Sequence, residues 1–172
     1  MSKDLTPAEF ISLLEEKTKE IENYIDNTAP RLIGKIAVEH FQANFDREGF
    51  ADIGNPSPWQ DVKRRDPNSP WFGFDATAKG SGYKSPKRMK DKILHDSGEL
   101  QASIDYETGK AQATIYSDKP YAQVHNEGGQ AKIFGKTPFT MPKRQFIGES
   151  RELNNKIVKQ LDEDITKILN KV

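Results

Sequence analysis

The sequence predicts an α+β fold. In it, a small antiparallel sheet (a hairpin plus one or two further strands) packs with an N-terminal helix pair and a long C-terminal helix. Apolar residues recur at three- and four-residue spacing near both ends of the chain, as in amphipathic helices. Between the ends, residues 102–107 and 111–117 alternate apolar and polar side chains around a turn at residues 108–110, which indicates a β-hairpin.

The N-terminal helix pair is predicted from local start and stop signals. Residues 6–9, Thr-Pro-Ala-Glu, have the form of a capping box with proline at the first helical position. Pro30 disfavours a helical residue before it, so we expect the first helix to end near Asn27 and a second to run from Pro30 to about Gly49. Helices joined by so few residues should lie antiparallel or cross steeply. The stripe of the first helix consists of Phe10, Leu13, Leu14, Ile21 and Ile25.

The C-terminal helix is predicted from about Glu149, with one long apolar stripe. Its residues are Leu153, Ile157, Leu161, Ile165, Ile168 and Val172. Their spacing suits a broad buried face, so we interpret the stripe as core, with a subunit seam as the alternative.

Four short elements are predicted near the hairpin at residues 102–117: one just before it, and three between it and the terminal helix. One helical turn covers residues 97–100, with Ser97 as its cap. A second short helix follows Asp118 and is closed by glycines at residues 128–129. A second hairpin turns at residues 135–136, and residues 144–147 form a short strand or extended segment.

The chain is expected to form one domain over residues 1–172, with a long, polar and flexible insertion at about residues 50–92. This stretch is rich in Gly and Pro and poor in apolar residues. Trp59 either anchors the insertion to the core or, with Trp71, contacts a partner.

The insertion also carries a group of cations: Lys84, Lys87, Arg88 and Lys90. Such a run is usually a solvated loop. The functional alternative is an electrostatic contact with an acidic protein surface or with DNA. The chain as a whole has 26 basic and 26 acidic residues, so a global attraction to nucleic acid or to anionic lipid is not expected.

No arrangement typical of catalysis is found in the sequence. There is no Cys, and the three His residues fall on different predicted elements. His125 and Glu127 suggest a metal-dependent nuclease or hydrolase only weakly, and the structural alternative is a helix end at which His125 meets the terminal carbonyls. We expect no cofactor and no metal. The first residues have no apolar leader, so we expect a soluble, unexported protein without membrane contact.

Three ordered blocks lie in the C-terminal half, at residues 93–104, 121–129 and 141–148, and two shorter ones precede them at 45–50 and 58–59. In order and spacing this pattern resembles the Mu-like phage virion morphogenesis proteins, also called tail completion proteins. The motif residues are Ser97, Gly98, Leu100, Tyr121, His125, Gly128, Gly129, Pro142, Arg144 and Phe146. The long basic loop at residues 60–92 departs from the usual form of the family.

The resemblance implies a non-enzymatic structural protein of a tailed phage or prophage that acts in tail completion or head–tail joining. It implies other tail or neck proteins as partners, a homo-oligomeric ring, and a location in the host cytoplasm during assembly and then in the virion. DNA contact, if present, would not be sequence-specific. A nucleic-acid-binding protein that uses the basic residues 79–92 is the alternative.

Overall fold

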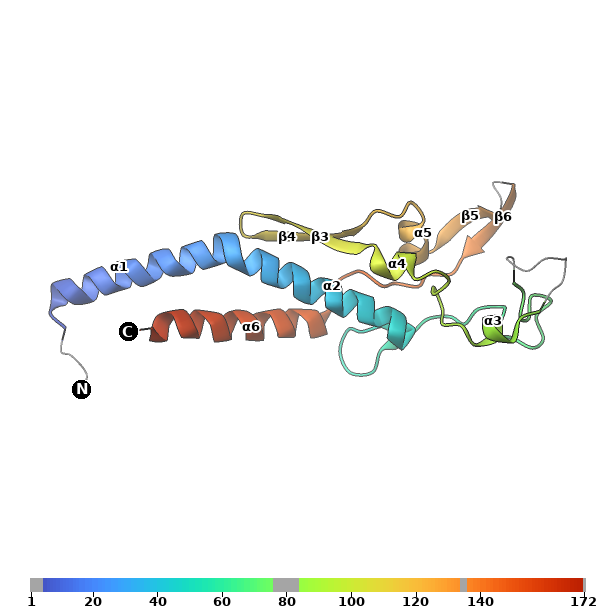
Figure 1. The fold of residues 1–172 in the computed structure, drawn as a ribbon, viewed down its shortest axis with the longest axis horizontal. Coiled ribbons are helices and arrows are strands. Elements are labelled where there is room, and N and C mark those ends of the chain that lie inside the picture. The colour runs from blue at the N-terminus through green and yellow to red at the C-terminus, as the bar shows by residue number, and fades with distance from the viewer. Residues whose placement is uncertain (1–4, 76–83, 134–135, 172) are drawn as a thin grey trace. The chain divides into compact units, whose positions relative to one another are not determined.

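The computed structural model describes residues 5–75, 84–133 and 136–171 (Figure 1). The chain divides into two compact units. Unit 1 consists of residues 1–38, 105–115 and 151–172, and unit 2 of residues 39–104 and 116–150. Helices and short antiparallel strand pairs alternate along the chain, which confirms the predicted α+β class. None of the described helices is both long and apolar enough to cross a membrane.

Helix α1 (Pro7–Asn23) begins where the capping box predicts. The Glu9 amide donates to Thr6 Oγ1 at 3.3 Å, and the Thr6 amide donates to Glu9 Oε2 at 2.8 Å. These two bonds satisfy backbone donors that the first helical turn leaves without intrahelical partners.

The predicted break between two N-terminal helices is wrong. Helix α1 continues through a π-helical turn, η1 (Tyr24–Thr28), into α2 (Ala29–Arg47) without reversing direction (Figure 1). Pro30 has no N–H to give to the Asp26 carbonyl, which would be its α-helical acceptor. That carbonyl instead accepts from the Ala111 amide at 3.3 Å, and the Ala29 amide makes the π-type bond to Tyr24 O. The hairpin turn therefore supplies the bond that Pro30 cannot.

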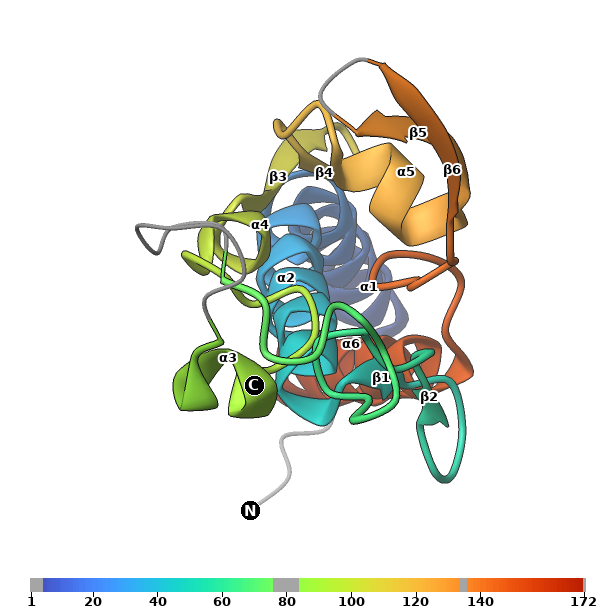
Figure 2. The same ribbon diagram turned by 90° about the vertical axis from the view of Figure 1, so that its right-hand side faces the viewer.

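The strands form three separate two-stranded sheets in the described part of the chain, where one small sheet was expected. Strand β1 (Gly49–Phe50) pairs with β2 (Ser57–Pro58), β3 (Ile104–Gly109) with β4 (Gln112–Ser117), and β5 (Gly129–Ile133) with β6 (Thr137–Met141). Both predicted hairpins are thus confirmed, although Gly135 of the second turn lies outside the described residues. The β5–β6 ribbon lies beside α5 (Ala122–Glu127) in both views (Figure 2). Isolated two-stranded sheets are marginally stable, so packing against other elements must hold them.

Two short helices differ from their predicted form. Helix α4 (Glu99–Ala102) has Gly98, at φ 83°, in the cap position predicted for Ser97. The Ser97 hydroxyl still accepts from the Glu99 amide, at 3.3 Å. Helix α3 (Pro86–Lys90) and strand β2 lie within residues 50–92, a stretch that the sequence indicates as loop throughout. Its Lys79–Gly82 linker lies outside the described residues.

Within unit 1, α1 contacts α6 (Arg151–Asn170), and Tyr24 Oη donates to Asp164 Oδ2 at 3.0 Å. The apolar stripe predicted for α6 is only partly buried. Leu153 is buried, and Ile157, Leu161, Ile165 and Ile168 are half-buried, while Val172 lies outside the described residues. Val158 and Leu169 are 65% and 54% exposed. On α1, Phe10, Ile11 and Leu14 are exposed as well.

The core of unit 2 forms where α2, the β1–β2 pair and residues 144–147 meet. Phe45 and Phe146 are almost completely buried, with ring centroids 5.1 Å apart. The Trp59 ring lies 5.5 Å from Phe45 in an edge-to-face arrangement, and Trp59 is 7% exposed. Trp59 is therefore part of this core, whereas Trp71, which packs edge-to-face on Phe74, is 47% exposed.

Candidate functional site

The extended segment at residues 144–147 joins two of the sequence blocks through side-chain and backbone hydrogen bonds. The Arg144 amide donates to the His125 carbonyl at 2.8 Å. Asn126 Oδ1 accepts from the amides of Phe146 and Ile147 at 2.8 and 2.9 Å. The C-terminal end of α5 thus substitutes for a neighbouring strand, which explains why this segment is extended but not part of a sheet.

Gly128 makes this arrangement sterically possible. It has φ 76°, and a Cβ atom there would lie 2.9 Å from Lys143 N and 3.0 Å from Met141 O. Any other residue would meet both a backbone conformation that is nearly restricted to glycine, with ψ at −170°, and a clash with backbone atoms. The predicted closure of the short helix at Gly128 is confirmed. Gly129 also has a positive φ, 119°, and the neighbouring Pro142 is half-buried.

The surroundings of His125 do not favour a bound cation. Burial, and secondly the positive charge of Arg144, hold the pKa of His125 below its usual value. Glu127 is exposed and accepts from Gln123 Nε2 at 3.2 Å. Among the residues that the structure describes, no three His, Asp or Glu side chains gather as metal ligands would.

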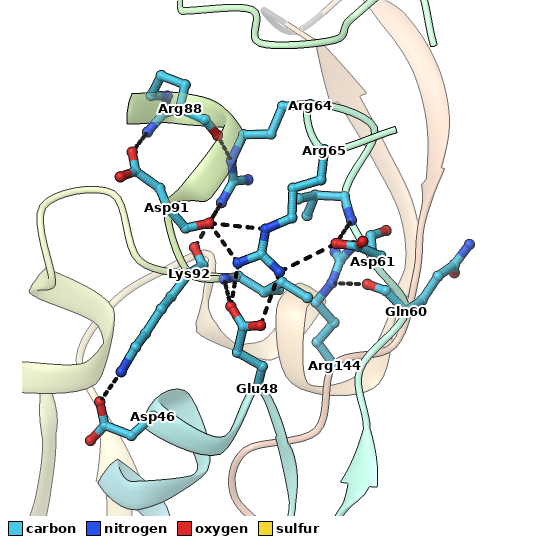
Figure 3. Close-up of polar contacts among 12 residues, drawn as sticks. Asp46, Glu48, Gln60, Asp61, Arg64, Arg65, Arg88, Asp91, Lys92 and Arg144 are labelled. Carbon is cyan, nitrogen blue, oxygen red and sulfur yellow. Dashed lines mark hydrogen bonds and ion pairs between the residues drawn. The ribbon is translucent and has the colours of Figure 1, made fainter. Parts of the chain in front are cut away.

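Four arginines gather in unit 2; we call Arg64, Arg65, Arg88 and Arg144 the arginine cluster (Figure 3). Arg65 is paired with Glu48 through two hydrogen bonds, of 2.9 Å to Oε2 and 2.5 Å to Oε1. Glu48 Oε1 also accepts from the Ile93 amide at 2.6 Å. The bond from Arg65, and to a smaller degree the Ile93 amide, hold the pKa of Glu48 below its usual value, despite burial.

Arg64 has no carboxylate within ion-pair distance among the described residues. Its guanidinium donates instead to three backbone carbonyls, those of Arg88 at 3.0 Å, Asp91 at 2.9 Å and Lys92 at 2.7 Å. Burial, and then the charges of Arg88 and Arg65, lower the pKa of Arg64. The carbonyls orient this cation without neutralising its charge.

Arg144 is similar to Arg64 in this respect. It is 6% exposed, and its guanidinium donates to the carbonyls of Gln60 at 3.1 Å and Asp61 at 3.4 Å. Burial, and then the charge of Arg64, lower the pKa of Arg144. In the described part of the chain Arg144 makes no ion pair either.

A cleft of about 540 Å³ in unit 2 brings many of the predicted site residues together. Three members of the arginine cluster line it, Arg64, Arg88 and Arg144. Six of the ten motif residues line it too, and they come from all three of the longer sequence blocks. These six are Ser97, Gly98, Leu100, Tyr121, His125 and Arg144.

The remaining predicted residues lie elsewhere. Phe146 and Trp59 are in the core, while Lys84, Lys87 and Lys90 are exposed. Lys84 lies 5.5 Å from the centre of the Phe72 ring. Neither Glu48 nor Arg64 is among the residues that the sequence singles out, although Glu48 lies in the block at residues 45–50 and Arg64 in the basic loop at residues 60–92.

The blocks that meet at this cleft were the basis of the resemblance, and a comparison with family models gives the same assignment. A model of the phage virion morphogenesis family matches residues 26–166. The chain belongs to this family. The match includes α2, both hairpins, the cleft and most of α6. No curated protein and no solved structure matches the chain. Membership of this family supports a role in phage virion assembly.

Proposed function

We propose that this phage virion morphogenesis protein is a non-enzymatic structural component that completes the tail, or joins tail to head, in a tailed phage or prophage. The family match over residues 26–166 is the main support. A second support is that six motif residues, drawn from all three of the longer blocks, line one cleft. Assembly takes place in the host cytoplasm, with other tail or neck proteins as partners, and the protein then remains in the virion.

We further propose that the protein assembles as a homo-oligomeric ring through unit 1. A ring needs two different surfaces on each subunit, related by a rotation that closes. Exposed apolar residues on α1 and on α6 are the proposed surfaces, because apolar side chains that lie in water gain free energy when a partner covers them. Val158 and Leu169 are eleven residues apart on α6, which places them on the same face of the helix.

The exposed cations around α3 are the proposed contact with an acidic neighbour. Lys87 and Lys90 are exposed and form no ion pair within the described residues. Trp71, exposed in the same stretch of chain, supplies an aromatic group of the kind enriched at interfaces. Complementary charge at such a surface would speed encounter and fix the register of docking.

Deletion of the gene from its phage or prophage tests the proposed function. Electron microscopy of the lysate should show heads together with defective or unjoined tails, and the gene supplied in trans should restore normal particles. Infectious particles of normal form from the deletion strain would contradict it. Reversal of charge at Lys84, Lys87 and Lys90 should reduce joining without unfolding the protein, and an unchanged titre would remove these residues from the contact.

A further inference from the structure

The cleft of unit 2 has an excess of positive charge that its own acids do not neutralise. Two carboxylates line it, and both are already paired: Asp96 with Arg88, and Glu99 with Lys119 at 3.5 Å. Arg64 and Arg144 then remain as cations bonded only to neutral acceptors within the described chain. Cations removed from water are normally paired. Arg144 is buried and Arg64 is half-buried, so two guanidiniums without a carboxylate at one cleft favour the binding of an anion there.

The geometry of the two guanidiniums is fixed before any anion arrives. The carbonyls of Arg88, Asp91 and Lys92 hold Arg64, and those of Gln60 and Asp61 hold Arg144 (Figure 3). A fixed guanidinium loses little side-chain freedom on binding, which favours affinity.

His125 lies beside these cations at the same cleft. His125 Nδ1 is buried without a hydrogen bond in the described chain, and the ring lines the same cleft. An anion bound beside Arg144 would also act on the charge of the neighbouring His125 ring, which makes this imidazole a reporter of the cleft.

The backbone at the rim of the cleft is strained. Leu94 has φ 56°, a left-handed conformation that is uncommon for a bulky residue and costs on the order of 1–3 kcal/mol. The preceding Ile93 amide is held by Glu48, which is itself left-handed at φ 51°. Strain of this kind persists where the surrounding contacts fix it, and it clusters at binding sites.

We propose that this cleft binds a carboxylate side chain on an acidic segment of another virion protein, with Arg64 and Arg144 as its ligands. The identity of the partner as a virion protein rests on the proposed function, whereas the binding of a carboxylate by Arg64 and Arg144 does not.

A protein segment fits the cleft better than nucleic acid does. Arg144 is recessed, while phosphates of a duplex are read by exposed cations on an outer surface. Leu94, Leu100 and Tyr121 add apolar lining next to the guanidiniums, which suits an acidic residue flanked by apolar ones. The volume of about 540 Å³ is within the range of pockets that bury small ligands or a few side chains.

A peptide titration of the purified full-length chain, followed by NMR, tests this proposal. The probe is a hexapeptide with blocked ends, Gly-Leu-Asp-Glu-Leu-Gly, and its control replaces the two acids by Asn and Gln. The acidic peptide should shift the Arg64 and Arg144 guanidinium signals saturably and raise the pKa of His125, since a nearby anion favours the imidazolium. The control peptide should leave both unchanged. Inorganic phosphate and a DNA duplex are run in parallel.

Two variants assign the response to the cleft. Arg64→Gln should weaken peptide binding about tenfold or more, because it removes a charge-assisted hydrogen bond. Lys63→Gln, which removes the same charge from an exposed neighbouring position, should not. Where Arg64→Gln perturbs the fold, Ser97→Glu decides: it places a carboxylate at the cleft and should block the peptide, while Ser97→Gln should not.

Three results would overturn the proposal. They are equal binding of the acidic and amide peptides, tighter binding of phosphate or DNA than of the acidic peptide, and a peptide response that survives both Arg64→Gln and Ser97→Glu. Failure of the proposed function is separable from these. If the peptide binds but the deletion strain makes normal particles, the cleft is an anion site and the assembly role is rejected. If the peptide does not bind but the deletion strain makes defective tails, the assembly role stands and the cleft proposal is rejected.

Discussion

The Trp59 indole N–H donates to the Gln145 carbonyl at 2.8 Å, between residues that are 86 positions apart in the chain. At the next residue along the chain, the Phe146 carbonyl accepts a hydrogen bond from Asn44 Nδ2 at 3.1 Å. The extended segment before α6 is therefore fixed by side chains from two other parts of unit 2. Arg144, which lies in the same segment, owes its position at the cleft to these bonds.

Trp59→Phe should destabilise the protein by about 1–3 kcal/mol, because the Gln145 carbonyl would lose its donor in a part-buried position. Urea denaturation measures this change. Trp71→Phe is the matched control at an exposed aromatic residue, and we expect a change within about 0.5 kcal/mol. Equal losses in the two variants would show that the Trp59 hydrogen bond contributes nothing.

Gly128→Ala should destabilise more than Gly54→Ala. Both glycines have a positive φ, 76° and 74°, so each variant bears a backbone strain on the order of 1–3 kcal/mol. Only at Gly128 does the new Cβ also meet backbone atoms, whereas nothing lies within 4 Å of it at Gly54. Thermal unfolding compares the two. His125→Ala should cost less stability than Gly128→Ala. A larger loss of stability for His125→Ala would contradict a mainly steric role for the residues at the end of α5.

The exposed face of α6 should govern self-association rather than the stability of the single chain. Val158→Ser with Leu169→Ser should leave thermal unfolding of dilute protein nearly unchanged and weaken association in sedimentation equilibrium. Lys156→Ser, on the opposite face of the helix, is the control. Leu153→Ala, at the buried end of the stripe, should instead cost about 2–5 kcal/mol of stability. Unchanged association in the double variant would place the subunit seam elsewhere.

Glu48 should make the free energy of unfolding depend on pH in the acidic range. Its folded pKa is depressed, chiefly by the bond from Arg65, so its stabilising effect is complete above its usual pKa of 4.5 and is lost as pH falls through the lower folded value. Glu48→Gln should be less stable than the wild type at pH 7, and the gap should narrow between pH values of about 5 and 3. Urea midpoints across this range measure the gap. A gap that is constant with pH would mean that the carboxylate charge is not the stabilising feature.

Local signals predicted those elements whose causes are local. The Thr6–Glu9 capping box and the Gly128 helix end each depend on a few neighbouring residues, and both are found as predicted. The break expected at Pro30 is absent because Ala111, distant in sequence, supplies the missing donor to Asp26. No spacing rule could anticipate that bond.

The site shows the same limit. Sequence blocks identified Ser97, Tyr121 and Arg144, but nothing in their spacing indicates that they line one cleft with Arg64. Periodicity gave the apolar face of α6 correctly, yet it says nothing of what covers that face. Val158 and Leu169, at the edge of that face, are exposed.

Complementation in vitro tests the assembly role most directly. Heads from a tail-deficient strain are mixed with tails from a strain that lacks this gene, and purified protein is added before the infectious titre is measured. The proposed function predicts that titre rises with added protein, saturates at a fixed number of subunits per tail, and fails to rise when the protein is omitted. Full titre without the protein, or no rise at any concentration of folded protein, would contradict it.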